Sequence, residues 1–290
     1  MSSRRLALAG LAALAISACG NLPQPHRGNP GGLAPQLLIP LAVRLAIPPP
    51  PEALMTDASA RLYADALSEA LQAADVPAIA LATPLPLDWR LDVKAENTGA
   101  NVVPRYTILD ADGRGQGAVQ GLPVPVRLWA EASPETLRAV AEQATPRVTQ
   151  LLLSVQAARA SADPSAITQG PPRLRLIPVR GAPGDGNVAL TARLREFLGN
   201  RGYVVQELAD GAAFAVTAEV SMVTAGPNLQ RVEIQWIVSR RDGNELGRVL
   251  QLNEVTAGQL NRFWGDVAYA AAQEAAGGVE TIIRNAATPG

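Results

Sequence analysis

The 290-residue chain carries 25 basic and 26 acidic residues, and its arginines are scattered, which argues against a nucleic acid partner. Its only histidine, His26, lies in a Pro- and Gly-rich stretch, so a Ser-His-Asp triad and a histidine-based zinc site are excluded. Its only cysteine, Cys19, cannot form a disulfide within the chain. A carboxylate pair or a Ser–Lys pair remains formally possible for catalysis.

Residues 1–18 have the features of a secretory signal peptide. Arg4 and Arg5 precede an apolar run from Leu6 to Ile16. As a helix this run would be about 16 Å long. A membrane span needs about 20 residues, so the run is a signal segment and not a transmembrane helix.

The end of this segment, Ile16-Ser17-Ala18-Cys19, resembles a bacterial lipobox. The resemblance implies that a peptidase cuts before Cys19 and that lipid on Cys19 anchors the protein to a membrane. The alternatives are an ordinary signal peptide with a nearby cysteine and a buried structural cysteine. Gly20 stands where an aspartate would retain an enterobacterial lipoprotein at the inner membrane. The similarity therefore implies the periplasmic face of the outer membrane, with the inner membrane as the alternative.

Composition divides the rest of the chain into two folded modules. Residues 19–36 are rich in Pro, Gly, Asn and Gln and predict a disordered tether behind the lipidated cysteine. Residues 159–172 have linker composition and separate modules at residues 37–158 and 173–285. Residues 286–290 are expected to form a disordered tail. Each module, at about 115–120 residues, is large enough for its own core.

Hydrophobic periodicity predicts the same α+β order in both modules: strand, helix, antiparallel sheet, helix. In the first module we expect a strand at 37–47, a helix at 57–74, antiparallel strands from Trp89 onward, and a helix at 134–158. In the second we expect a strand at 173–179 and a helix at 188–200, with Asn187 as its N-cap and Gly202 as its C-cap. We then expect strands from Phe214, with a hairpin turn at Asp242-Gly243, and a helix at 259–285.

An internal repeat with an offset of 130 residues supports this division. Without a gap, the segment that begins at Val102 matches the one that begins at Val232, and their two Asp-Gly pairs coincide. The same offset pairs Leu137 with Val267 and Leu152 with Ile282 in the closing helices. Identities are few, so the alternative is chance similarity between two α+β segments.

Several motifs have both a functional and a structural interpretation. The glycines of Gly113–Gly117 do not open a helix after a parallel strand, so we predict a hairpin turn and not a dinucleotide site. The segment Asp110–Gly113 lacks the distal ligands of a calcium loop. Pro48–Pro51 is expected to be a rigid loop, with a partner-docking segment as the alternative.

The tryptophans and a group of acidic residues also have both a functional and a structural interpretation. The four tryptophans are expected to anchor the cores, although they could line a glycan or peptide groove; they are Trp89, Trp129, Trp236 and Trp264. Asp88, Asp92 and Glu96 alternate along one strand and are expected on its solvated face, with a general acid–base pair as the alternative.

The order of elements in the second module is similar to that of a recurring bacterial envelope module. The similarity lies in Arg201–Val205, Phe214–Val220 and Arg241–Gly243. Similar modules include the TolB amino-terminal domain, the CsgG secretion lipoproteins and the lipoprotein activators of penicillin-binding proteins. The resemblance implies a module that binds proteins or assembles and is not an enzyme, and it assigns no functional residue.

The sequence therefore predicts a non-catalytic envelope lipoprotein with Cys19 as its lipidation site and with no catalytic, metal or cofactor residue. We expect sheet edges, or the concave face between the modules, to bind an envelope protein that the sequence does not identify. The sequence leaves the oligomeric state open. The alternatives are a lipid- or solute-transfer component with an apolar cavity between helix and sheet, and a carboxylate-dependent cell-wall hydrolase.

Overall fold

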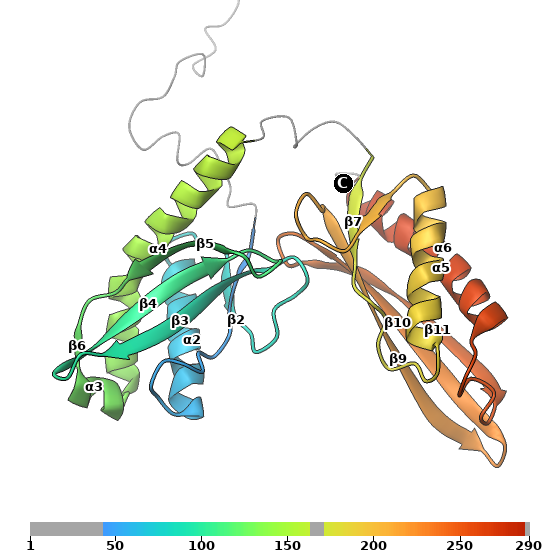
Figure 1. Ribbon diagram of the computed structural model, residues 1–290, viewed down its shortest axis with the longest axis horizontal. Helices are drawn as coiled ribbons and strands as arrows, with labels where there is room; N and C mark the ends of the chain where they lie inside the picture. The colour runs from blue at the N-terminus through green and yellow to red at the C-terminus, as the bar shows by residue number, and fades with distance from the viewer. Residues whose placement is uncertain (1–42, 163–170, 288–290) are drawn as a thin grey trace, which may run out of the picture. The chain divides into compact units, whose positions relative to one another are not determined.

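The computed structural model describes residues 43–162 and 171–287, which form two mixed sheets, each accompanied by a pair of long helices (Figure 1). The signal peptide, Cys19 and the predicted tether lie outside the described residues, as do residues 163–170 of the predicted linker and the last three residues. Within the described part of the chain, no helix combines the length and the apolar character that a membrane crossing requires.

The first sheet has the strand order β2-β1-β3-β4-β5, and β6 also pairs with β4. Its module contains β1 (Leu45–Ile47), α2 (Asp57–Gln72), β2 (Ala78–Ala80), β3 (Trp89–Asn97), β4 (Asn101–Leu109), β5 (Gly115–Gln120), β6 (Val124–Pro125), α3 (Val126–Glu131) and α4 (Pro134–Ala162). β1 is parallel to both β2 and β3, whereas β3, β4 and β5 are successively antiparallel.

The second sheet repeats this topology in the order β11-β10-β9-β7-β8. Its module contains β7 (Arg173–Leu176), α5 (Gly186–Asn200), β8 (Val204–Gln206), β9 (Phe214–Gly226), β10 (Leu229–Arg240), β11 (Glu245–Thr256) and α6 (Gly265–Ala287). β7 is parallel to both of its neighbours, and β9, β10 and β11 are antiparallel. The prediction of an α+β fold made of two repeated units is confirmed.

The two long helices of each module, α2 and α4 in the first and α5 and α6 in the second, cover one face of its sheet (Figure 1). The first of them, α2, begins after Thr56, whose hydroxyl accepts a hydrogen bond from the backbone N–H of Ser59 at 3.2 Å. Tyr63, Leu67 and Leu71 lie at helical spacing on α2 and are fully buried against the sheet. The sequence predicts the helix from an overlapping apolar stripe that includes Leu62, but Leu62 is 47% exposed.

All four tryptophans are buried, as predicted for core anchors. Trp89 and Trp129 belong to the core of the first module, and Trp236 and Trp264 to that of the second. The indole N–H groups of three of them have acceptors within the protein: Trp129 donates to the carbonyl of Ala53, Trp236 to the side chain of Gln251, and Trp264 to the carbonyl of Pro183. Their polar atoms are therefore satisfied inside the protein, as burial requires.

The two hairpins match in detail at the offset of 130. A β-bulge separates Ile108 from Leu109 on β4, and a second one separates Val238 from Ser239 on β10. At both turns the glycine of the Asp-Gly pair, Gly113 or Gly243, has a φ of +80°, which favours glycine. The predicted hairpins and their turns are confirmed.

The predicted register of the closing helices is wrong by one residue. Gly117 on β5 faces Leu151 of α4, and its counterpart Gly247 on β11 faces Ile282 of α6. The buried positions agree with an offset of 131: Leu137, Ala141, Val148 and Leu152 on α4 correspond to Ala268, Ala272, Val279 and Ile283 on α6. The helices are rich in alanine, so their sequence alone does not distinguish neighbouring registers.

A hydroxyl pair is buried in the core of the first module. The hydroxyl oxygens of Tyr63 on α2 and Tyr106 on β4 lie 2.5 Å apart, and both side chains are fully buried. Burial raises the pKa of Tyr106 to about 12. Burial, together with the charge that Tyr106 would carry, raises the pKa of Tyr63 well above its usual value.

We expect this pair to make the fold sensitive to alkaline pH. Because the folded-state pKa of Tyr106 exceeds the usual value of 10, its contribution to stability is complete below pH 10 and is lost as the pH rises through about 12. Tyr106→Phe should cost about 1–3 kcal/mol at pH 8, because it leaves a buried hydroxyl on Tyr63 without its partner. Urea denaturation between pH 8 and pH 11.5 measures both effects.

The double variant Tyr63→Phe/Tyr106→Phe provides the control for this prediction. It should cost less than the sum of the two single changes, because no buried hydroxyl remains unpaired. It should also remove most of the alkaline loss of stability, whereas Tyr269→Phe, at a half-exposed position, should leave that loss unchanged. An alkaline loss that persists in the double variant would contradict the assignment.

Several predicted boundaries and contacts differ in the structure. The last helix begins at Gly265 and not at residue 259, because a turn with Gly258 at a φ of +81° precedes it. Asn187 is not the N-cap of α5; it lies inside the first turn, where its side chain accepts from the N–H of Ala182 at 3.0 Å. The predicted C-cap is confirmed, since Gly202 follows α5 at a φ of +88°.

Candidate functional site

The acidic residues that could serve a hydrolase are held by groups of the protein itself. The alternation of Asp88 with Asp92 predicted a solvated position for Asp88. This prediction is wrong, because the carboxylate of Asp88 is buried. Arg44 donates to it through two nitrogens, at 2.9 and 2.8 Å, and the backbone N–H of Leu85 donates at 2.7 Å. Asp88 therefore tightens a loop before β3, and its oxygens face protein donors.

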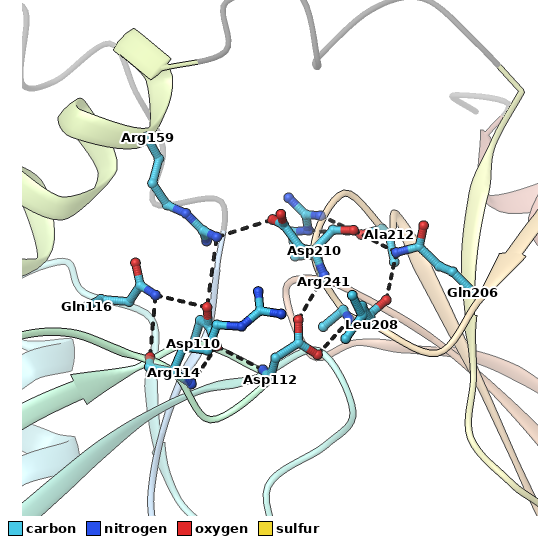
Figure 2. Close-up of polar contacts among 11 residues, drawn as sticks. Asp110, Asp112, Arg114, Gln116, Arg159, Gln206, Leu208, Asp210, Ala212 and Arg241 are labelled. Carbon is cyan, nitrogen blue, oxygen red and sulfur yellow. Dashed lines mark hydrogen bonds and ion pairs between the residues drawn. The ribbon is translucent and has the colours of Figure 1, made fainter.

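Asp110 and Asp112 are likewise acceptors for protein donors (Figure 2). The carboxylate of Asp110 accepts from the backbone N–H groups of Asp112 and Arg114 and from the amide of Gln116, at 2.9–3.0 Å. The carboxylate of Asp112 accepts from the backbone N–H groups of Ala209 and Asp210, at 2.8 and 3.3 Å. N–H groups pointed at these oxygens occupy the positions that a calcium ion would need.

The other charged groups of this cluster are paired in the same way. Figure 2 shows Arg159 of α4 between Asp110 and Asp210, with nitrogen–oxygen distances of 3.9 and 3.2 Å. Arg241 donates to the carbonyl of Ala212. Across residues 43–162 and 171–287, no group of three or more His, Cys, Asp or Glu side chains is placed to hold a metal ion. The cluster resembles a structural polar network more than a reaction centre.

In both modules the closing helix touches the sheet directly. A Cβ atom on Gly117 of β5 would lie 2.8 Å from Leu151 of α4, and one on Gly278 of α6 would lie 2.5 Å from Val249 of β11. Real Cβ atoms do not approach other atoms so closely, so a larger residue at either position would force the facing side chain to move. At these positions the layers leave no room for a bound lipid.

The candidate site for binding a partner is the strand β11. It is the last strand of the second sheet, is 12 residues long, and pairs only with β10 among the described residues (Figure 1). Its outer side therefore presents backbone N–H and C=O groups without a strand partner. Such an edge is a template for the addition of another strand.

The side chains of β11 distinguish its two faces. Val249, Gln251 and Val255 face the helices: the two valines pack against the core, and Gln251 donates to the carbonyl of Ala271 at 3.0 Å. The alternate residues Arg248, Leu250, Leu252 and Glu254 face the opposite side. Leu250 and Leu252 are 51% and 57% exposed there, an unusual position for two neighbouring leucines on one face.

The corresponding edge strand of the first module is shorter. β5 has 6 residues, half as many as β11, and it likewise pairs with only one strand, β4, among the described residues. The chain then turns back through Pro123 and Pro125, and β6 pairs with β4 at Asn101 and Val102, beyond the end of β5. A short edge strand and nearby proline are two devices by which proteins limit pairing at an exposed edge.

Sequence reasoning identified the hairpin but not this surface. The prediction of strands with a turn at Asp242-Gly243 did not separate the two faces of the strand that follows the turn, and the structure shows that Leu252 on this strand is exposed. The available signal was the strict alternation from Arg248 to Glu254, with leucines on the face opposite Val249. Cys19, the predicted lipidation site, lies outside the described residues.

Comparison with known proteins found no matching family model and no matching curated sequence. Among solved structures, the chain is similar to the PelC dodecamer from Paraburkholderia phytofirmans, with 11% identity and a TM-score of 0.28 over 37% of this chain and 85% of that one. It is also similar to a minor lipoprotein from Acinetobacter baumannii, with 15% identity and a TM-score of 0.22 over 39% of this chain and 89% of that one. Likenesses at this level assign neither a family nor a function to the chain.

Proposed function

We propose that this chain is a lipid-anchored protein of the bacterial cell envelope that acts by binding protein and not by catalysis. The observation that supports it best is the open edge of β11 with its two exposed leucines. An edge of 12 residues is long for a strand left without a partner. The edge strand of the first module, β5, is only half as long, at 6 residues, and prolines follow it.

The proposed anchor is lipid on Cys19, as the similarity of Ile16–Cys19 to a lipobox implies. A diacylglyceryl group and an amide-linked acyl chain together provide the two or more chains that stable membrane attachment requires. Gly20 after the cysteine favours the periplasmic face of the outer membrane. The two modules would then be held close to that surface, where other envelope proteins are concentrated.

The anchor can be tested in cells of the source bacterium by membrane fractionation. Cys19→Ala should move nearly all of the protein from the membrane to the soluble fraction, because the variant lacks the thiol to which the lipid would be attached. Gly20→Asp is the matched variant: it keeps the lipid, and the protein should stay in the membrane but shift from outer- to inner-membrane density. A Cys19→Ala protein that remains with the membranes would refute the anchor.

Binding through β11 can be tested separately by crosslinking. A photoreactive residue at position 252 should give reproducible crosslinked products in intact cells, because Leu252 is exposed at the proposed site. The same residue at position 62, where the exposed side chain of Leu62 lies on helix α2, is the control and should give far fewer products. Equal labelling at both positions would contradict a specific binding edge.

A further inference from the structure

The exposed face of β11 has a symmetrical pattern. Read along the strand, its side chains are Arg248, Leu250, Leu252 and Glu254: a positive charge, two leucines and a negative charge. All four pair regularly with β10, from Ile237 opposite Arg248 to Arg231 opposite Glu254, and the β-bulge of this hairpin lies outside the segment. The edge is therefore straight enough over this stretch to accept another antiparallel strand.

A second copy of the same strand fits this pattern in one register. In a two-fold symmetric antiparallel pair, directly opposed residues lie on the same face of the sheet. With Gln251 at the centre, Leu250 lies opposite the second copy's Leu252, and Arg248 lies opposite the second copy's Glu254. Symmetry repeats both pairs, so the interface contains two leucine pairs flanked by two ion pairs.

Neighbouring registers do not fit. Moving the centre by one or two residues in either direction places Arg248 or Glu254 opposite a leucine, which leaves a charge against an apolar side chain. Opposite charges and apolar pairs stabilise directly opposed positions, whereas mismatched positions lose that stabilisation. The side-chain pattern thus specifies both the partner and the register.

We propose that the partner of β11 is a second copy of this chain, and that the two second-module sheets join through β11 into one continuous sheet with Gln251 at the two-fold axis. This inference rests on the proposed function, because it names the partner of the same site. It also accounts for the exposure of Leu250 and Leu252, which pairing with the second copy would cover. A homodimer of this kind is an isologous assembly, closed by its own symmetry.

The charges of Arg248 and Glu254 can be changed to test the proposed dimer, because the ion pairs that these residues form within one chain are exposed. Arg248 pairs with Glu245 at 2.8 Å, and Glu254 pairs with Arg231 at 3.2 Å; all four side chains are about half exposed. Exposed pairs of this kind contribute little to stability, so changing them should not unfold the protein. A charge swap breaks both pairs within the chain, but it restores the pairs between two copies.

The first experiment is sedimentation equilibrium of the full-length lipidated protein in density-matched detergent. Arg248→Glu and Glu254→Arg should each weaken dimerisation by about tenfold or more, because each change creates two repulsive pairs across the axis. The double variant Arg248→Glu/Glu254→Arg should recover the wild-type dissociation constant to within about threefold. A monomeric wild-type protein, or a double variant as weak as the two singles, would overturn the proposal.

The second experiment tests the register in cells by oxidative disulfide formation. Chains that carry Leu250→Cys and chains that carry Leu252→Cys, with different tags, should crosslink to each other when expressed together. Either variant alone should crosslink poorly, because identical positions would then be diagonal neighbours about 7–8 Å apart. Equal crosslinking of 250 with 250 and of 250 with 252 would exclude this register.

The outcomes separate this inference from the proposed function. If position 252 captures only a different envelope protein, the proposed binding function stands and the second copy is wrong as the partner. If position 252 captures nothing and the protein is monomeric, both fail. The lipid anchor is decided by the Cys19→Ala fractionation alone.

Discussion

Replacing Arg44 with methionine is expected to destabilise the first module by about 3–5 kcal/mol, because it leaves the buried carboxylate of Asp88 without a counter-charge. The side chain of Asp88 has no exposed surface, and that of Arg44 is only 15% exposed. Water therefore cannot replace the two charge-assisted hydrogen bonds that Arg44 donates. Methionine keeps much of the arginine's apolar volume, so the loss reports the charge more than the packing.

The control is the double variant Arg44→Met/Asp88→Asn. Its neutral amide can still accept the hydrogen bond from the N–H of Leu85, and no buried charge remains. Most of the stability lost in Arg44→Met should return, as measured by urea denaturation followed by circular dichroism. If the double variant is no more stable than Arg44→Met, the cost lies in packing and not in the unpaired charge.

Changing Gly181 to alanine is expected to destabilise the second module by about 3 kcal/mol or more, through strain and overlap. Gly181 connects β7 to α5 at a φ of +89°, a conformation that residues with a Cβ atom rarely adopt. An added Cβ would lie 2.1 Å from the carbonyl oxygen of Val220 on β9, and a backbone atom of a sheet has little freedom to move away. Thermal or urea denaturation measures the loss.

Gly199 is the matched control in the same module. It lies in α5, where an added Cβ would meet nothing within 4 Å. Gly199→Ala should therefore stabilise the protein by about 0.5–1 kcal/mol, because alanine loses less backbone freedom in a helix. Opposite signs for these two Gly-to-Ala changes are the expected result, and a similar loss in both would contradict the explanation.

The parts of the fold that the sequence predicts well are those with strong local signals. The turn at Asp242-Gly243 follows from a glycine between two alternating runs, and α2 follows from an apolar stripe at helical spacing. The tryptophans are buried because few other side chains in this chain could fill so much of the core. These features depend on neighbours in sequence or on composition.

The parts that were missed depend on distant contacts. β2 and β8 are three residues long, and each is a strand only because it pairs with the opening strand of its module. β6 has two residues and α3 has six, and neither carries a periodic signal. Asp88 appeared to alternate with solvated residues, but it pairs with Arg44, which lies 44 positions away in the chain.

The sequence predicts the kind of site, a sheet edge, but not which edge it is. A duplicated sheet predicts two corresponding edge strands, but it does not predict how long each of them is. In the first module, β5 ends after 6 residues, and Val124 and Pro125 then return to pair with β4. In the second, β11 continues for 12 residues before the chain enters a turn at Gly258 and then α6. That difference depends on the path of the chain after the strand, which no local sequence pattern predicts.

The short edges of the other strands bear on how large the proposed assembly would become. Each chain has two sheets, but only β11 offers a long edge among the described strands, since β2 and β8 are three residues each and the β5 edge is short and followed by prolines. A chain with two long open edges would add copies at both and polymerise without end. With one long edge, the proposed pairing through β11 would stop after a single addition, and its stoichiometry would be finite.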